Sequence, residues 1–138
     1  MQRQVFQNTR QSDMLSDAKA TVEMLQQALE FDNRVRFISV VNDMGIPLAS
    51  AIRKGIASLE PPELTMKQQV HSVLTVCLAE EFDEYFGQTN YILVHREKLQ
   101  LIFFAVSERV YVAASVEPDF PVARISDFVV SVKGILQS

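Results

Sequence analysis

The side chains that most often carry enzyme chemistry are scarce in this sequence and are not grouped. It has two histidines, His71 and His95, and one cysteine, Cys77. His71 and Cys77 are six residues apart, which does not place two metal ligands on one face of a helix, and no second histidine stands near them. His95 stands beside Arg96 and Glu97, where a solvated histidine is the ordinary expectation. The sequence therefore predicts no metal site.

Nucleophilic and phosphate-binding motifs are also missing. Neither histidine is flanked by a strand-to-helix nucleophile turn, so no Ser-His-acid combination can be assigned. The four glycines do not have the spacing of a dinucleotide-binding motif or a P-loop. A lone cysteine on an apolar helical face, as Cys77 is, is typical of a small packing residue. We therefore expect a protein that is not an enzyme and has no catalytic residues and no cofactor.

An acidic cluster stands at the end of the second predicted helix. Glu80, Glu81, Asp83 and Glu84 follow one another closely there, and each opposes the helix macrodipole at a cost of roughly 0.3 kcal/mol. The ordinary interpretation is a solvated face. The alternative is an acidic rim that binds a basic partner or a cation.

Composition places the chain among globular proteins and limits its partners. At 138 residues, with 48% hydrophobic and 22% charged residues, it has about the length of one domain. The net charge of −4 argues against a nucleic-acid partner, because phosphate-binding surfaces need clustered Lys and Arg. A single cysteine excludes an internal disulfide, and no stretch resembles a signal peptide or a membrane span. We expect a soluble cytoplasmic protein with no membrane partner.

The stretch from Arg34 to Lys54 predicts two antiparallel strands joined by a tight turn. The first strand is apolar on both faces, which is typical of a strand in the interior of a sheet covered by helices on each side. Asn42, Asp43 and Gly45 have the side chains that favour a turn. Pro47 removes one backbone donor from the second strand, so we place that strand at an edge of the sheet.

Apolar residues at helical spacing predict three helices. The first spans residues 13–31 and follows a flexible polar tail over residues 1–12. The second begins at Thr65, where Gln68 three residues later fits a capping box, and Gly87 ends it. The third follows residue 119 and runs towards the C-terminus.

Three further strands fill the space between the second and third helices. They cover Thr89–Val94, Leu99–Ser107 and Val110–Val116, and their short connections require an antiparallel meander. The predicted fold is therefore α/β of the α+β type, in the order α-β-β-α-β-β-β-α. The five-stranded antiparallel sheet has the order 2-1-5-4-3, with the second helix on one face and the first and last helices on the other. The residues expected to be almost wholly buried are Phe37, Val40, Leu101, Phe103, Val112, Ile125 and Val129.

This order of elements resembles the roadblock / dynein light chain superfamily, which is related in shape to profilin-like and longin-like domains. The stretch VVNDMGIPLAS resembles the hairpin of roadblock proteins, with its short acidic or Gly-containing turn and small-residue strand. The longer stretch RVRFISVVNDMGIPLASAIRKG resembles still more closely a family of small uncharacterised prokaryotic proteins. The resemblance implies one roadblock-like domain over residues 13–138 and a dimeric platform for small GTPases and motor or signalling complexes.

Two functions follow from this pattern. The first is a noncatalytic, homodimeric protein-interaction module, a scaffold or regulator of a small GTPase or a signalling complex. The alternative is a small-molecule-binding sensory domain with a profilin-like fold. A cavity of a few hundred Å³ under a helix would favour the sensory domain, whereas a filled core with an exposed apolar face on the second helix would favour the interaction module.

The expected dimer rests on an unprotected edge strand. The strand Thr89–Val94 has no proline and no inward charge to prevent pairing with another strand. The second helix is apolar over more of its circumference than one sheet surface can bury. We therefore expect a two-fold dimer in which these strands pair antiparallel and the second helices lie side by side. The expected interface residues are Val70, Val73, Leu74, Cys77, Tyr91, Ile92, Leu93 and Val94.

Overall fold

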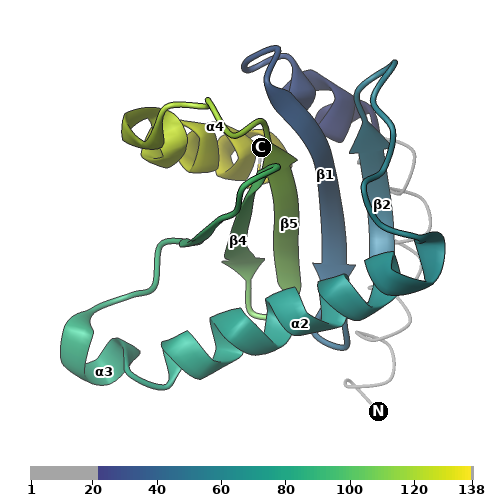
Figure 1. Cartoon of the computed structure of the whole chain (residues 1–138). Coiled ribbons are helices and arrows are strands. Elements are labelled where there is room, and N and C mark those ends of the chain that lie inside the picture. Colours follow the sequence, from purple (N-terminus) through teal and green to yellow (C-terminus); the bar gives the residue numbers. More distant parts are fainter. Residues whose placement is uncertain (1–21, 138) are drawn as a thin grey trace.

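The computed structural model describes residues 22–137 and shows helices on both faces of one sheet (Figure 1). Its first described element is a helix over residues 22–29, here called the N-terminal helix. The predicted tail and the predicted start of the first helix lie outside the described residues. The other elements are β1 (Val35–Asn42), β2 (Pro47–Ile52), α2 (Pro62–Glu80), α3 (Asp83–Phe86), β3 (Ile92–His95), β4 (Gln100–Ser107), β5 (Val110–Val116), a short 3-10 helix η1 (Val122–Arg124) and α4 (Ile125–Gln137).

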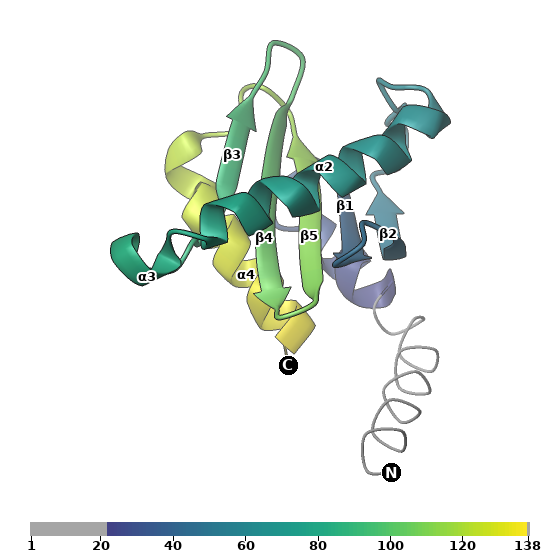
Figure 2. The same cartoon turned by 90° about the horizontal axis from the view of Figure 1, so that it is seen from below.

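The five strands form one antiparallel sheet in the order β2-β1-β5-β4-β3. This order confirms the prediction, in which β2 and β3 are the edge strands. α2 crosses one face of the sheet diagonally, and α3 lies beyond the β3 edge (Figure 2). β3 is therefore the edge strand nearest to α3 and to the C-terminal end of α2.

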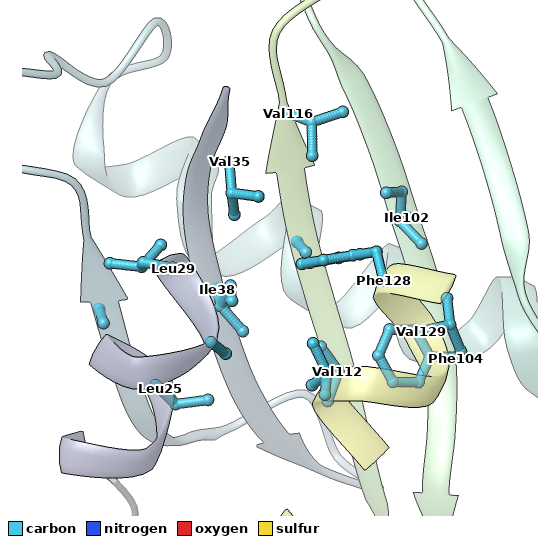
Figure 3. Packing of buried hydrophobic residues seen from close by; sticks show 14 of the residues in the cluster. Leu25, Leu29, Val35, Ile38, Ile102, Phe104, Val112, Val116, Phe128 and Val129 are labelled. Atoms are coloured by element: carbon cyan, nitrogen blue, oxygen red, sulfur yellow. The ribbon is translucent and has the colours of Figure 1, made fainter. Parts of the chain in front are cut away.

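The predicted layers are confirmed by two apolar clusters on opposite faces of the sheet. The N-terminal helix and α4 share the larger cluster, in which Leu25 and Phe128 pack against strand residues such as Ile38 (Figure 3). α2 covers the other face, where Val73 packs in a smaller cluster with Phe103. The two faces are therefore covered unequally, by two helices on one side and one on the other.

Two of the seven residues expected to be almost wholly buried are not. Phe37 on β1 and Leu101 on β4 are only half-buried, whereas the other five are buried as predicted. Both face the side of α2 but lie beside the helix rather than beneath it. A bulge between Val35 and Phe37 also interrupts the alternation, so that Val35 joins the larger cluster on the opposite face.

The predicted capping box at Thr65 is wrong. α2 begins three residues earlier, at Pro62, with Pro61 at the N-cap and no side-chain cap. A proline in the first turn is compatible with a helix because the first backbone N–H groups have no intrahelical acceptor. The Thr65 hydroxyl donates instead to Glu60 Oε1 at 3.1 Å. Gly87, with φ of 87°, ends the short α3 rather than α2.

The third strand is shorter than predicted. It starts at Ile92 instead of Thr89, because Thr89 donates from both its backbone N and its hydroxyl to Asp83 Oδ1, at 3.1 and 2.6 Å. Asp83 belongs to α3, so this contact holds the segment before β3 against α3. The strand then continues to His95, which the sequence placed in a turn and which pairs with Gln100.

The carboxylate of Asp32 joins three parts of the chain. Its Oδ1 accepts from the backbone N and Nε of Arg34, both at 2.8 Å, and its Oδ2 accepts from Arg124 at 2.7 Å. Arg124 also lies over the ring of Phe31, 4.8 Å from its centroid. The segment after the N-terminal helix, the start of β1 and the start of α4 are thus linked by one side chain. Hydrogen bonds from Arg34 hold the pKa of Asp32 well below its usual range.

We expect Asp32→Asn to lower the free energy of unfolding by about 1–3 kcal/mol at pH 7, the usual worth of hydrogen bonds to a charged group. The folded-state pKa of Asp32 lies below its unfolded value, so the stabilisation is present above about pH 4 and is lost as the pH falls further. Urea unfolding at pH 7 and pH 3 tests this. An equal difference between wild type and variant at both pH values would contradict it.

The β1–β2 turn holds α2 in place. Asn42 Oδ1 accepts from the backbone N of Met44 and Ile46, at 2.9 and 3.0 Å, as the sequence led us to expect of an Asn in a turn. Gly45 then adopts φ of 81°, and a Cβ at this position would lie 2.7 Å from Val70 Cγ2 and 2.8 Å from Val70 Cα. The turn therefore contacts the backbone of α2 directly, with no room for a side chain.

We expect Gly45→Ala to destabilise the protein more than Gly55→Ala. Gly55 has φ of 85°, but a Cβ added to it would meet nothing within 4 Å, so its substitution isolates the backbone cost of about 1–2 kcal/mol. Gly45→Ala adds the collision with α2, at about 1–3 kcal/mol more. Urea unfolding of both variants measures the difference. Equal losses would show that the turn does not position α2.

Candidate interaction surface and cavity

α2 presents a row of apolar side chains to solvent. Only Gln69, Ser72, Val73 and Val76 of this helix are buried. On its outer side Met66, Val70, Leu74 and Leu78 follow one another at intervals of four residues and are exposed, which places them on one face of the helix. We call these four residues the outer stripe.

The structure corrects one of the eight expected interface residues. Val73 is only 3% exposed and packs against the sheet of its own chain, so it is not available to a second copy. Val70 and Leu74 belong to the outer stripe, and Cys77 borders it and is exposed. The broad apolar pattern of the helix concealed which side faces the sheet.

The expected strand residues lie at the open edge of the sheet. Among the described residues β3 pairs only with β4, so its other side offers unpaired backbone groups. Ile92 and Val94 pack on the α2 side of the sheet, whereas Tyr91 and Leu93 pack on the side of α4. All four are half-buried. The C-terminal half of α2, which carries Leu74 and Leu78 of the outer stripe, extends towards this edge (Figure 2).

The cysteine and the two histidines form no catalytic or metal-binding centre. Cys77 is exposed rather than packed in the core, and its Sγ lies 3.4 Å from the Tyr111 hydroxyl. That contact, together with burial, raises the pKa of Tyr111 above its usual range. His71 and His95 are both exposed, His71 on α2 and His95 at the end of β3. Within residues 22–137, no group of three or more His, Cys, Asp or Glu could hold a metal ion.

The acidic cluster is part of an exposed aromatic projection. Phe82, Tyr85 and Phe86 are 53%, 76% and 83% exposed, and the rings of Phe82 and Phe86 stack 5.9 Å apart. Residues 80–86, which also carry the four acidic side chains, are here called the α3 knob. Partial burial and the nearby Asp83 raise the pKa of Glu80. The sequence predicted Phe82 and Phe86 as part of the apolar face of the second helix, whereas both are exposed.

A cavity of about 370 Å³ lies beside the N-terminal half of α2. Its floor is the sheet, and its wall is formed by the loop between β2 and α2, including Ile56 and Leu59. The two residues that the sequence wrongly placed in the core, Phe37 and Leu101, line it. The size is within the range of small-molecule sites. The sequence did not predict this cavity, because it depends on small strand residues such as Ala113 that leave space beneath the loop.

The polar groups of the cavity are mostly neutral. Gln69 donates to Ser39 Oγ at 3.1 Å, where both residues are buried. Ser115 lines the cavity, is only 8% exposed, and its hydroxyl makes no hydrogen bond to any described residue. The charge of Arg36 is already paired with Glu117. The cavity therefore offers a free hydroxyl group within apolar walls.

A second, more open groove of about 580 Å³ lies between α2 and the β3–β4 turn. Its walls carry the basic side chains of Lys67, Arg96 and Lys98 together with His71. We call it the basic groove. Apolar side chains, including Leu64 and Leu99, and two carboxylates, Glu60 and Glu97, complete its lining.

Comparison with known proteins gives structural relatives only. No protein-family model matches the sequence, and no curated protein matches it. No helix within residues 22–137 is long and apolar enough to span a membrane.

Several solved structures share the arrangement of elements. The gliding protein MglB from Thermus thermophilus superposes with a TM-score of 0.69 at 13% identity, covering 83% of this chain and 84% of that one. A Roadblock/LC7 domain from Streptomyces avermitilis gives 0.67 at 8% identity, with coverage of 84% and 93%. MglC from Myxococcus xanthus gives 0.56 at 13%, with coverage of 82% and 93%. At such identities the likeness concerns the fold, and by its strand order, its helices and these superpositions the chain has the fold of the roadblock superfamily.

Proposed function

We propose that this chain is a noncatalytic, homodimeric protein-interaction module of the roadblock type. The observation that carries the proposal is the exposed outer stripe of α2 together with the unpaired edge of β3, towards which the C-terminal half of α2 extends. Isolated exposed apolar residues are ordinary, but a row of four on one helix face, in a molecule that also has a free strand edge, is typical of an interface.

In the proposed dimer the two β3 strands pair antiparallel and continue the sheet from one copy to the other. The outer stripes of the two α2 helices then meet across the two-fold axis, because they lie on the same side of the extended sheet. An interface of this kind should bury more than about 1,000 Å² in total. One solved MglB structure with a TM-score of 0.71 to this chain is described as having a tetrameric arrangement, which supports association through this fold.

We further propose a small GTPase or a signalling complex as the partner of the dimer, in a scaffolding or regulatory role. This step rests on the resemblance to roadblock proteins. It is tested by measuring the binding of the purified dimer to small GTPases loaded with GDP or with a nonhydrolysable GTP analogue. Absence of binding to either form would remove the GTPase and leave the dimer proposal intact.

We expect Leu74→Asp to weaken the dimer about a hundredfold. The leucine is 54% exposed in the single chain, so the charge does not disturb its core. At a two-fold interface the substitution occurs twice, and each buried charge costs more than about 1.4 kcal/mol, or tenfold. Sedimentation over a range of protein concentrations measures the dissociation constant.

Val130→Asp on α4 is the matched control, because Val130 is also exposed but lies on the opposite face of the sheet. It should leave the dimer unchanged. A wild-type monomer at tens of micromolar, or a Leu74→Asp variant as dimeric as wild type, would refute the proposed dimer. Leu93→Lys is a less specific test, since Leu93 packs against the core of its own chain.

The cavity beside α2 favours a second function, the binding of a small molecule. Its apolar walls and the single free hydroxyl of Ser115 suit a neutral compound with an apolar body and one hydrogen-bonding group. A carboxylate would have to compete with Glu117 for Arg36. The filled core expected of a pure interaction module is thus absent on this side of the sheet.

We expect octanamide to raise the melting temperature of the protein and octanoate to raise it less, because only the amide needs no charged partner. Ala113→Val, which reduces the cavity, should abolish the shift. Ala105→Val is the control, since Ala105 packs on the same face of the sheet but does not line the cavity. No shift with either compound, or equal shifts in both variants, would argue against this ligand class.

A further inference from the structure

The α3 knob has no partner within the described part of its own chain that covers its aromatic rings. Phe82, Tyr85 and Phe86 are all more than half exposed. α3, which forms most of the knob, lies beyond the β3 edge (Figure 2). It carries four carboxylates and no basic residue. Such a projection is costly in a free monomer, because its apolar rings are left in water.

The lining of the basic groove carries more positive than negative charge, with Lys67, Arg96 and Lys98 against Glu60 and Glu97. Its side chains Lys67, Arg96 and Lys98 take part in none of the ion pairs formed within residues 22–137. Leucine side chains also line the groove. A segment with carboxylates on its outside and aromatic rings at its centre would therefore match both the charge and the polarity of the groove.

The knob and the groove of one chain stand at opposite ends of β3. The knob precedes Ile92, the first residue of the strand, and is held there by the contact between Asp83 and Thr89. The groove adjoins the turn that follows His95, the last residue of the strand. Both lie on the α2 side of the sheet. Because they stand at opposite ends of β3, the length of the strand separates them and they do not meet within one copy.

Antiparallel pairing of two β3 strands exchanges these ends. The first residue of one strand then lies beside the last residue of the other. The knob, which extends beyond its own sheet, is carried over the sheet of the second copy at the end where the groove opens. We propose that the α3 knob of each copy binds in the basic groove of the other copy. The inference rests on the proposed dimer and adds a second, charge-complementary contact to it.

Two charge-reversed variants test the contact. One carries Glu81→Lys with Glu84→Lys in the knob, and the other carries Arg96→Glu with Lys98→Glu in the groove. All four side chains are exposed, so each variant should keep the circular dichroism spectrum of the wild type. We expect the dissociation constant of each homodimer to rise at least about tenfold, because like charges then face each other at both contacts.

An equimolar mixture of the two variants gives the decisive measurement. In the mixed dimer each knob meets a groove of opposite charge, so the heterodimer should form in preference to either homodimer with nearly the affinity of the wild type. Native mass spectrometry resolves the three species. Asp127→Lys on α4 is the control, since it reverses a charge on the other face of the sheet and should change nothing.

Phe86→Ala tests the apolar part of the contact without changing any charge. Phe86 is the most exposed ring of the knob, so its removal cannot create a cavity in the core. We expect the dimer dissociation constant to rise about tenfold, against no change for Val130→Ala on α4.

The outcomes separate the two proposals. A monomeric wild type would overturn the dimer and this contact together. A wild-type dimer with unchanged homodimers of both charge-reversed variants, or a mixture without preference for the heterodimer, would overturn the contact between knob and groove alone. In that case the groove would be free for an anionic ligand or another acidic protein.

Discussion

The contact between α2 and the sheet determines where the cavity and the outer stripe lie. A helix of 19 residues touches this face through only four buried residues, and two of them, Gln69 and Ser72, are polar. The hydrogen bond from Gln69 to Ser39 and the close approach of Gly45 to Val70 fix where the helix lies. So narrow a contact cannot cover a five-stranded sheet. The uncovered part of the sheet becomes the cavity, and the uncovered part of the helix becomes the outer stripe.

The length of α2 explains the projection at the β3 edge. At 1.5 Å per residue the helix is about 28 Å long, whereas five strands about 4.8 Å apart span only about 19 Å between the outer two. A helix of this length laid straight across the sheet would extend past it, and on its diagonal path the C-terminal end of α2 reaches the β3 edge (Figure 2). Gly45 holds the α2 backbone at Val70, near the middle of the helix, and the C-terminal half extends towards the β3 edge, where it ends in an overhang (Figure 2). The acidic and aromatic residues of the α3 knob occupy this overhang, where no strand of the same chain lies beneath them.

Strand order was predictable from the sequence, whereas the orientation of α2 was not. The two strands that are apolar on both faces had to be internal, and Pro47 marked an edge, so the order β2-β1-β5-β4-β3 followed from pattern alone. On α2 the apolar residues surround the helix, and its buried line contains Gln69 and Ser72 while Leu74 and Leu78 face solvent. Hydrophobic pattern therefore could not distinguish Val73 from Val70. The cavity and the basic groove also arise between segments distant in the chain, so no local motif marks them.

The same helix contributes to the proposed interface and to the proposed ligand site, which makes the two physically dependent. Gln69 borders the cavity, and Val70, the next residue, belongs to the outer stripe. A ligand that binds only one position of α2 would change the free energy of the dimer, and dimerisation would change the affinity for the ligand by the same factor. The rigid seat of the helix on Gly45 limits how far α2 can move. A coupling therefore requires small rotations of α2 about its contact with the β1–β2 turn, which would move the α3 knob, at the far end of the overhang, more than any other part of the interface.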